Sequence, residues 1–378
     1  MKTNTFEILV AATLLVLFFC VSCGNPYDYK EFEKAPPLGM FVATTDFTSG
    51  SAAIIKDAPS FSVSQPGVSL SSDPAARSYN GKVYVINRFG ADNIQVLDPK
   101  ENYKTIAQYS TGNESNPQDI AFVSESQAFI SRLGEAKLLI VKPLSGKSLG
   151  SIDLSKYSDG DGLPEAAKMV IVDSRLFVAL QRLDSTEFYA PTDMKGLIVV
   201  IDIISGTVLS TVELATKNPA TDLIYDAASS KIFVGCSGGI KLYGYPENDG
   251  GIESISIDIG KDEYKADGVL FDEVALGGDV LGMAMVSNKQ AYALVGDASF
   301  NNYLVRFNPS DPAEGITKIW QTSSWIAAIA LDSEGFLYVA DRDFTNPGVR
   351  IWDTSTDTQV TGSLIDVGLP PYNFALIQ

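Results

Sequence analysis

Residues 82–98 read KVYVINRFGADNIQVLD, and this stretch carries the pattern that decides the fold. An apolar segment centred on Tyr84 is followed, after a short polar turn, by a second apolar segment at 93–98. Both have the length and composition of β-strands. The aromatic residue with a small or β-branched successor recurs at Phe41, Tyr84, Phe129, Phe177, Phe233, Tyr292 and Tyr338. The spacings of 43, 45, 48, 56, 59 and 46 residues indicate seven repeats of about fifty residues.

Further strand patterns surround each aromatic segment. A second apolar strand is predicted at 93–98, 138–141, 197–202, 240–243, 303–307 and 349–353. Half-exposed third strands with period-2 alternation follow, for example at 148–154 and 208–214. A strand of small residues precedes several of the aromatics, as at 119–122, 222–225 and 326–331. Four short strands per repeat are typical of a β-propeller blade.

The two ends of the chain complement one another. Residues 372–377 form an innermost-type strand with no aromatic strand after it, whereas the repeat of Phe41 lacks such a strand before it. We therefore predict an all-β, seven-bladed β-propeller over 39–378, closed by the C-terminal strand joining the first blade. Six or eight blades are the alternatives, because the spacings of 56 and 59 residues could conceal an extra element.

The N-terminus has the features of an export signal. Lys2 precedes an apolar run at 8–21, which fits a secretory signal and is too short to span a bilayer as a helix. We interpret 1–22 as a lipoprotein signal peptide, Cys23 as the lipidated residue and 23–38 as a tether. This interpretation predicts export across the inner membrane and lipid anchoring in the cell envelope. Gly24 after Cys23 favours the outer membrane.

Composition excludes several functions. The 378-residue chain has no histidine, so it can form no Ser-His-Asp site and no His-ligated metal centre. A net charge of −18 makes nucleic acid an improbable partner, because Lys and Arg supply most of the affinity for phosphate backbones. Once Cys20 leaves with the signal and Cys23 is acylated, Cys236 is alone, and we expect a buried, inert thiol. We expect a monomer.

Long insertions point to one face of the predicted ring. Loops from an outer strand to the next inner strand, and loops between second and third strands, leave a propeller at the same end. The insertions at 155–164, 183–195 and 261–279 fall in such loops. We expect this face to bind a partner, although surface loops also tolerate added length without a function.

Arginine recurs at the same face, where four of the aromatic strands end in Arg88, Arg132, Arg182 and Arg342. Guanidinium groups bind carboxylate and phosphate well, so these residues are candidate ligand-binding residues for an anion. In the alternative interpretation each arginine pairs with a neighbouring carboxylate, such as Asp119, Asp222 or Asp341, and ties adjacent blades together.

One acidic loop suggests a metal. Asp159, Asp161 and Glu165 lie in the run DGDGLPE, which is similar to Asp/Gly-rich calcium loops because carboxylates are the ligands that Ca²⁺ prefers. The run lacks most of the EF-hand frame, so a solvated turn is the alternative. Calcium is the one cofactor that the sequence suggests.

The repeats resemble a known family. Residues 81–87 with 93–98, and 205–212, are similar to YVTN-type propeller repeats of bacterial surface and periplasmic proteins, and 331–341 resembles NHL-type repeats. The resemblance implies a propeller scaffold, and related propellers include calcium-dependent lactonases. We therefore expect a non-catalytic envelope module that binds a protein or glycan. The alternative is a lactonase-like hydrolase, which would need Asp, Glu and Asn from several blades around an axial calcium.

Overall fold

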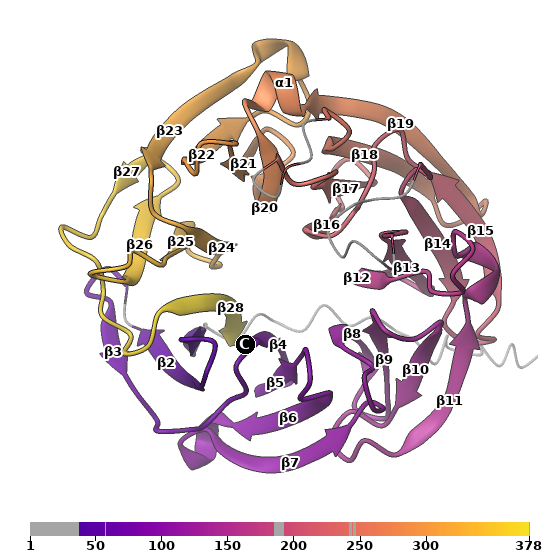
Figure 1. The fold of residues 1–378 in the computed structure, drawn as a ribbon, viewed down its shortest axis with the longest axis horizontal. Coiled ribbons are helices and arrows are strands. Elements are labelled where there is room, and N and C mark those ends of the chain that lie inside the picture. The colour runs from indigo at the N-terminus through magenta and orange to yellow at the C-terminus, as the bar shows by residue number, and fades with distance from the viewer. Residues whose placement is uncertain (1–37, 57, 185–192, 242–243, 245–246, 378) are drawn as a thin grey trace, which may run out of the picture. The chain divides into compact units, whose positions relative to one another are not determined.

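The computed structural model describes residues 38–56, 58–184, 193–241, 244 and 247–377. The predicted signal peptide, Cys23 and all of the tether except Leu38 lie outside the described residues. The described chain forms seven four-stranded antiparallel sheets arranged around a central axis, so the predicted seven-bladed β-propeller is confirmed (Figure 1). We number the blades 1 to 7 in the order in which their inner strands surround the axis, beginning with the blade of β28 and β1.

Each blade runs from an inner strand at the axis to an outer strand at the rim. The inner strands are β28 (Pro371–Ile377), β4 (Pro74–Tyr79), β8 (Pro117–Ser124), β12 (Ala166–Val172), β16 (Asp222–Asp226), β20 (Asp279–Ser287) and β24 (Ile326–Leu331). The second strands are β1 (Gly39–Thr45), β5 (Lys82–Asn87), β9 (Gln127–Arg132), β13 (Arg175–Leu180), β17 (Lys231–Cys236), β21 (Gln290–Gly296) and β25 (Phe336–Asp341).

The two remaining positions complete the sheets. The third strands are β2 (Gly50–Lys56), β6 (Asn93–Asp98), β10 (Lys137–Val141), β14 (Leu197–Asp202), β18 (Gly251–Asp258), β22 (Asn302–Phe307) and β26 (Gly348–Asp353). The outer strands are β3 (Ser62–Ser64), β7 (Lys104–Ser110), β11 (Ser148–Asp153), β15 (Val208–Glu213), β19 (Glu263–Asp272), β23 (Ile316–Thr322) and β27 (Thr358–Gln359). One helical turn, α1 (Glu273–Leu276), follows β19. None of the described helices is long and apolar enough to cross a membrane.

The C-terminal strand closes the ring as predicted. β28 pairs antiparallel with β1, and Ala375 lies opposite Phe41. The first blade is therefore assembled from both ends of the chain, and β28 covers the edge of β1 that would otherwise be unpaired.

Packing between blades explains why the aromatic residues recur. Each pair of neighbouring blades shares one hydrophobic cluster, including the pair formed by blades 7 and 1. Phe41, Phe129 and Phe177, each on a second strand, are fully buried in these clusters. The repeat in the sequence is thus the repeat of one packing position, filled once per blade.

The strand order places all the connections from second to third strands, and from outer strands to the next inner strands, at one end of the ring. We call this end the loop face. The connections at 154–165 and 181–196 lie there as predicted, the latter only in its described part, because 185–192 lie outside the described residues.

Two predictions in blade 5 are wrong. The apolar strand predicted at 240–243, next after the aromatic strand, is wrong, because the strand that pairs with β17 at this position is β18 (Gly251–Asp258). Lys241 instead forms ion pairs with Glu273 and Asp279 in the loop that precedes β18. The predicted insertion at 261–279 is mostly the outer strand β19 with α1. β19 was not recognised as a strand from the sequence. Every second residue of this outermost strand faces solvent, and its charged side chains obscure the alternation of polar and apolar residues.

Candidate functional site

The four predicted arginines all lie at the loop-face ends of their second strands, but the protein itself occupies their guanidinium groups. Arg88 donates to Asp73 Oδ1 at 2.6 Å and to the Tyr372 hydroxyl at 3.0 Å. Asp73 precedes β4 and Tyr372 lies in β28, so Arg88 ties two inner strands together.

Arg132 and Arg182 bind backbone carbonyls. Arg132 Nη1 donates to the carbonyl of Thr111 at 2.8 Å, and Arg182 Nε donates to that of Tyr157 at 3.0 Å. Both carbonyls belong to connections that lead from an outer strand to the next inner strand. These arginines fasten the loop face in the way that the alternative interpretation expects, but their main partners are carbonyls. The structure does not bring the four arginines together around one cavity.

The predicted calcium loop does not form a metal site among the described residues. Glu165 is buried, and burial together with the nearby Asp161 charge raises its pKa to about 8, so this carboxyl group is largely neutral at pH 7. Asp161 is exposed and accepts the Leu163 amide at 2.7 Å. No group of three His, Cys, Asp or Glu side chains in the described chain could hold a metal ion. Calcium at this loop therefore stays a prediction.

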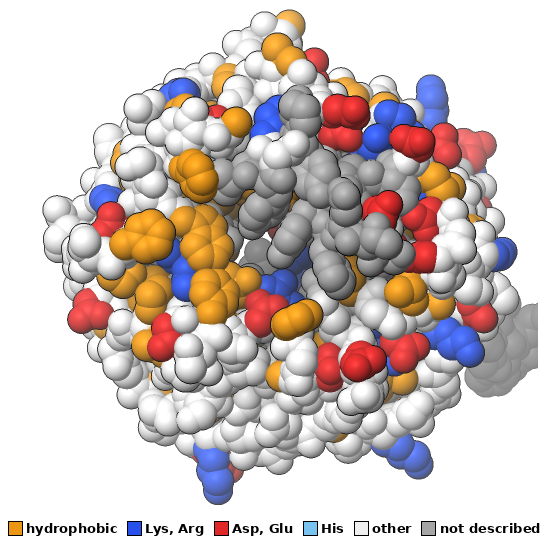
Figure 2. Space-filling view, viewed as in Figure 1, with side chains coloured by type: hydrophobic (Ala, Val, Ile, Leu, Met, Phe, Trp, Pro, Cys, Tyr) orange, Lys and Arg blue, Asp and Glu red, His pale blue; other side chains and the backbone are white. Residues whose placement is uncertain are grey.

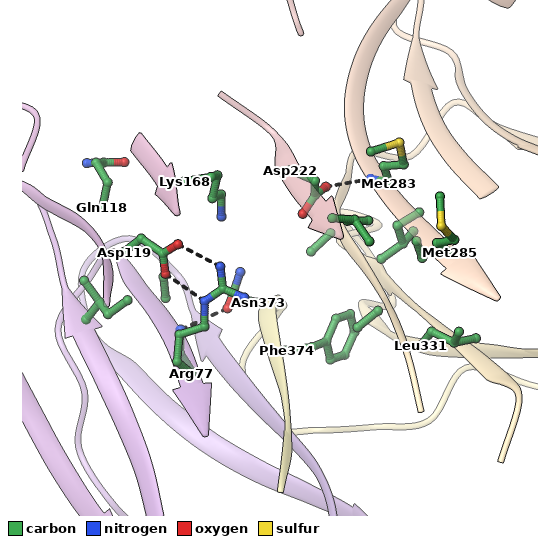
Figure 3. Close-up of a pocket in the computed structure, with 18 residues that line it drawn as sticks. Arg77, Gln118, Asp119, Lys168, Asp222, Met283, Met285, Leu331, Asn373 and Phe374 are labelled. Carbon is green, nitrogen blue, oxygen red and sulfur yellow. Dashed lines mark hydrogen bonds and ion pairs between the residues drawn. The ribbon is translucent and has the colours of Figure 1, made fainter. Parts of the chain in front are cut away.

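A second site lies on the axis, where all seven inner strands line a cavity of about 270 Å³ (Figure 3). In each blade the buried aromatic residue of the second strand pairs with one residue of the inner strand. We define the axial tier as the set of seven residues, one per blade, that lie two positions before that paired residue in the sequence. The register gives this tier, for blades 1 to 7, as Asn373, Ala75, Asp119, Lys168, Asp222, Gly282 and Ala328. The three charged residues therefore occupy the adjoining blades 3 to 5, whereas Ala or Gly stands in blades 2, 6 and 7 and Asn373 in blade 1.

The tier carboxylates also fasten neighbouring blades. Asp119 Oδ2 accepts the amide of Met169 at 2.9 Å, and Asp222 Oδ2 accepts that of Met283 at 2.7 Å. Asn373 Oδ1 accepts the amide of Ala76 at 3.0 Å in the same way. In each case the side chain binds the inner strand of the next blade, so part of the tier has a structural role.

Asp119 is fully engaged by its neighbours. Arg77, on β4, donates from Nε to Asp119 Oδ1 at 2.7 Å and from Nη2 to Oδ2 at 2.8 Å. Although burial opposes it, the Arg77 charge holds the pKa of Asp119 below its usual range. Arg77 nevertheless lines the cavity, and 45% of its side chain is exposed.

Lys168 and Asp222 are less well satisfied. Within the part of the chain that the structure describes, no hydrogen bond or ion pair reaches the Lys168 ammonium. Burial and the Arg77 charge lower the pKa of Lys168. Burial also raises the pKa of Asp222 to about 6, although Lys168 opposes this shift. A cation and a carboxyl group thus stand beside one cavity with hydrogen-bonding capacity left over.

The opposite wall of the cavity is apolar. It consists of Met283 and Met285 from β20, Ile329 and Leu331 from β24, and Phe374 from β28. Figure 3 shows Met285, Leu331 and Phe374 across the cavity from Lys168 and Asp119. The cavity is therefore amphipathic, with its charged wall on blades 2 to 5 and its apolar wall on blades 6, 7 and 1.

A third feature is a group of aromatic side chains on the loop face, beside the central opening (Figure 2). Four second-to-third loops each expose a phenylalanine, and they belong to the adjoining blades 6, 7, 1 and 2. Phe344 is 94% exposed and Phe89 is 73% exposed. We call the following set the aromatic crown: Phe300, Phe344, Phe47, Phe89, Trp325 and Tyr372.

Tight turns hold the crown in place. Asp46 Oδ1 accepts the amides of Thr48 and Ser49 at 2.8 and 2.7 Å, and this turn presents Phe47. The turn of Phe344 is built identically, because Asp343 Oδ1 accepts the amides of the second and third residues after it at 2.9 and 3.0 Å. Asp-initiated turns of this kind fix the local backbone. The crown is therefore presented by ordered loops.

Arg342 supports the crown from below. Its guanidinium lies 4.6 Å from the centre of the Phe47 ring, 4.8 Å from that of Trp325 and 5.3 Å from that of Tyr372. Phe47 and Trp325 are stacked with their planes 13° apart. Trp320 contacts Trp352 of the next blade, whereas Trp325 is 41% exposed on the loop face.

Sequence reasoning missed most of these residues. Lys168, Arg77 and Asn373 were not singled out, and Asp119 and Asp222 were named only as possible arginine partners. Aligning the repeats on the buried aromatics and stepping back along the inner strand would have found the axial tier. The aromatic crown could also have been recognised from the sequence. DFTS at 46–49 and DFTN at 343–346 follow the buried aromatics Phe41 and Tyr338 at the same distance.

No protein-family model matches this chain, and no curated protein matches it significantly. Among solved structures, it is similar to a periplasmic gluconolactonase of Pseudomonas aeruginosa (TM-score 0.60, 13% identity), covering 90% of this chain and 99% of that one. It is also similar to the Swd1 β-propeller domain of Myceliophteria thermophila (TM-score 0.57, 9% identity, 85% and 98% covered). A third neighbour is apo AztD of Citrobacter koseri (TM-score 0.51, 10% identity, 89% and 97% covered). At these identities the likeness shows that the chain has the β-propeller fold.

Proposed function

We propose that this chain is a protein-binding module of the bacterial envelope, anchored through lipid on Cys23, whose aromatic crown contacts its partner. The observation that carries the proposal is the recurrence of an exposed phenylalanine on the loop faces of four adjoining blades. Exposing large aromatic side chains to water is unfavourable for a monomer, and the same side chains often contribute much of the binding free energy at protein interfaces. Their fixed turns reduce the entropy lost on binding.

The surroundings of the crown suggest the partner's chemistry. Hydrogen bonds from Thr345 and Asn346 lower the pKa of Asp343, and hydrogen bonds to Ser49 and Thr48 lower that of Asp46, so both carboxylates are ionised at neutral pH. With a net charge of −18, the protein attracts basic surfaces. We infer a partner with an apolar depression rimmed by Lys or Arg. The turn carboxylates are occupied by their own backbone amides, which leaves few groups to bind sugar hydroxyls and favours protein over glycan.

The test compares the two faces of the ring. A partner would be isolated from solubilised envelopes with the immobilised mature chain, and its affinity for purified variants would be measured. The double variant Phe89→Ala/Phe344→Ala removes two crown rings, whereas Leu144→Ala/Ile204→Ala removes two exposed apolar side chains at third-to-outer turns of the opposite face. We expect the crown variant to bind about tenfold more weakly or worse, and the control variant to bind normally.

Equal affinities for both variants would contradict the role of the crown. Binding that survives digestion of all protein in the partner fraction would identify a glycan and contradict the proposed partner class.

The anchor has a separate test. Cys23→Ala should abolish incorporation of labelled fatty acid and move the chain from the membrane to the soluble fraction, because acyl chains supply the membrane affinity. Unchanged labelling would contradict the lipoprotein assignment. The lactonase alternative gains no support from the axial tier, because its two carboxylates stand beside Arg77 and Lys168.

A further inference from the structure

Among the residues that the structure describes, no hydrogen bond or ion pair reaches the ammonium group of Lys168 in the axial cavity, and this requires an explanation. Lys168 belongs to β12 and points into the cavity between Asp119 on one side and Asp222 on the other (Figure 3). Neither carboxylate forms an ion pair with it in the described structure, since Asp119 is bound to Arg77 and Asp222 to the amide of Met283. A lysine held in this way keeps three donors for another acceptor.

The cavity is large enough for more than water. Its volume is about 270 Å³, whereas an engineered cavity of about 150 Å³ in another protein holds benzene. The tier residues Ala75 and Ala328 line the cavity with short side chains, and side chains as long as Lys168 at these positions would fill it. The wall opposite Lys168 offers only apolar atoms from Met283, Met285, Ile329, Leu331 and Phe374.

We propose that the axial cavity binds a small organic acid, whose carboxylate lies against the Lys168 ammonium and whose apolar part packs against the methionine, isoleucine, leucine and phenylalanine wall. The exposed guanidinium of Arg77 adds a second cation at the same wall. A carboxylate satisfies the unpaired donors, and an apolar tail of a few carbon atoms removes the opposite wall from water. This site is independent of the aromatic crown, so failure of either proposal leaves the other standing.

The charge of Asp222 should make ligand binding in the axial cavity dependent on pH. The groups that act on Lys168 are Arg77 from β4, Asp119 from β8, Asp222 from β16 and, further away, Arg88. Asp119 stays ionised and Arg77 stays cationic, because each holds the other in its charged form. Asp222 changes charge with a pKa of about 6. Below that pH two cations face one carboxylate and an acid is attracted; above it a second negative charge opposes the ligand.

The test uses calorimetric titration of the mature chain with phenylacetate, hexanoate and cyclohexanecarboxylate at about pH 5.5 and about pH 8. Phenylacetamide matches phenylacetate without the charge, and acetate lacks the tail. We expect at least one of the three acids to bind more tightly at the lower pH, and acetate and phenylacetamide to bind about tenfold more weakly or worse.

Variants locate the binding. Lys168→Met should weaken binding about tenfold or more, Lys168→Arg should retain it, and Lys142→Met, at a distant exposed turn, should change nothing. Asp222→Asn should keep the tight binding at the higher pH and remove the pH dependence. Cooperative thermal unfolding of each variant would show that it is folded.

Three results would each overturn the proposal. They are the failure of all three acids to bind at millimolar concentrations, equal binding of phenylacetate and phenylacetamide, and undiminished acid binding by folded Lys168→Met.

Discussion

Blades 6, 7, 1 and 2 and blades 3, 4 and 5 share one scaffold but differ on every surface that a ligand could reach. On the loop face each blade of the first group exposes a phenylalanine, whereas the second group carries the exposed Asp161 and the buried Glu165 in the described part of its longer connections. On the axis the first group contributes most of the apolar wall and also Arg77 of blade 2, and the second contributes Asp119, Lys168 and Asp222. The buried aromatic position is filled in both groups. The comparison shows that the scaffold is symmetric and that its binding surfaces are not.

The largest expected effect tests the symmetric part. Phe41→Ala in blade 1 and Phe177→Ala in blade 4 each remove a fully buried ring, so each should lower the free energy of unfolding by about 3–5 kcal/mol. Urea unfolding followed by circular dichroism measures both values. A much smaller loss for Phe41→Ala would mean that the blade built from the two chain ends is not an equal part of the ring.

Two arginines sharpen the comparison at the loop face. Arg342 donates to the carbonyls of Thr45, Pro370 and Pro371 and contacts three rings, whereas Arg132 donates to the carbonyls of Thr111 and Lys137. Unpaired buried carbonyls destabilise a fold, so Arg342→Ala should cost about 2–3 kcal/mol and Arg132→Ala about 1–2 kcal/mol. The same unfolding experiment measures them. The reverse order would show that the crown does not depend on its supporting arginine.

The two halves should also respond to pH with opposite signs. The folded-state pKa of Glu165 is raised to about 8, so its contribution to stability is fully present below about pH 4.5 and is lost as pH rises to about 8. For Asp297 in blade 6, burial opposes the shift, but hydrogen bonds from Tyr303 and Asn301 lower the pKa to about 2. Its contribution is present above the ordinary aspartate pKa and is lost as pH falls through about 2.

Unfolding free energies measured across pH would check this. Glu165→Gln should remove about 1 kcal/mol or more of the decline between about pH 5 and pH 8, whereas Asp297→Asn should change only the acid side of the profile. A wild-type profile that Glu165→Gln leaves unaltered would show that Glu165 is ionised in the folded protein.

The smallest effect concerns the crown itself. Phe344 is 94% exposed, so Phe344→Ala should change the free energy of unfolding by less than about 0.5 kcal/mol. A stable Phe344→Ala variant that loses partner binding would separate function from folding. A large loss of stability would instead make Phe344 a structural residue.

The sequence predicts the scaffold well because one packing position recurs in it. The strands of blade 2 were predicted closely at β5 and β6, and closure by β28 followed from the missing aromatic strand at the C-terminus. The strand predicted at 240–243 in blade 5 was wrong. Ile240 and Leu242 alternate with polar residues as in a strand, but Lys241 lies in a loop, where it forms ion pairs with two carboxylates. A local pattern cannot reveal such a tertiary constraint.

The binding surfaces are harder to predict because they depend on register and on contacts between blades. Lys168, Asp119 and Asp222 are more than forty residues apart, and only the alignment of three inner strands places them in one tier. The prediction that Arg88, Arg132, Arg182 and Arg342 reach the loop face is confirmed by the strand order. The sequence did not show that backbone carbonyls would be main partners of three of them.

Site-specific photocrosslinking tests the asymmetry of the two surfaces most directly. A photoreactive phenylalanine analogue would replace Phe344 in the crown or Leu144 on the opposite face, and intact cells would be irradiated. We predict that position 344 forms a discrete adduct with one envelope protein and that position 144 does not. An adduct from position 144 alone, or none from position 344 in correctly localised protein, would contradict the account.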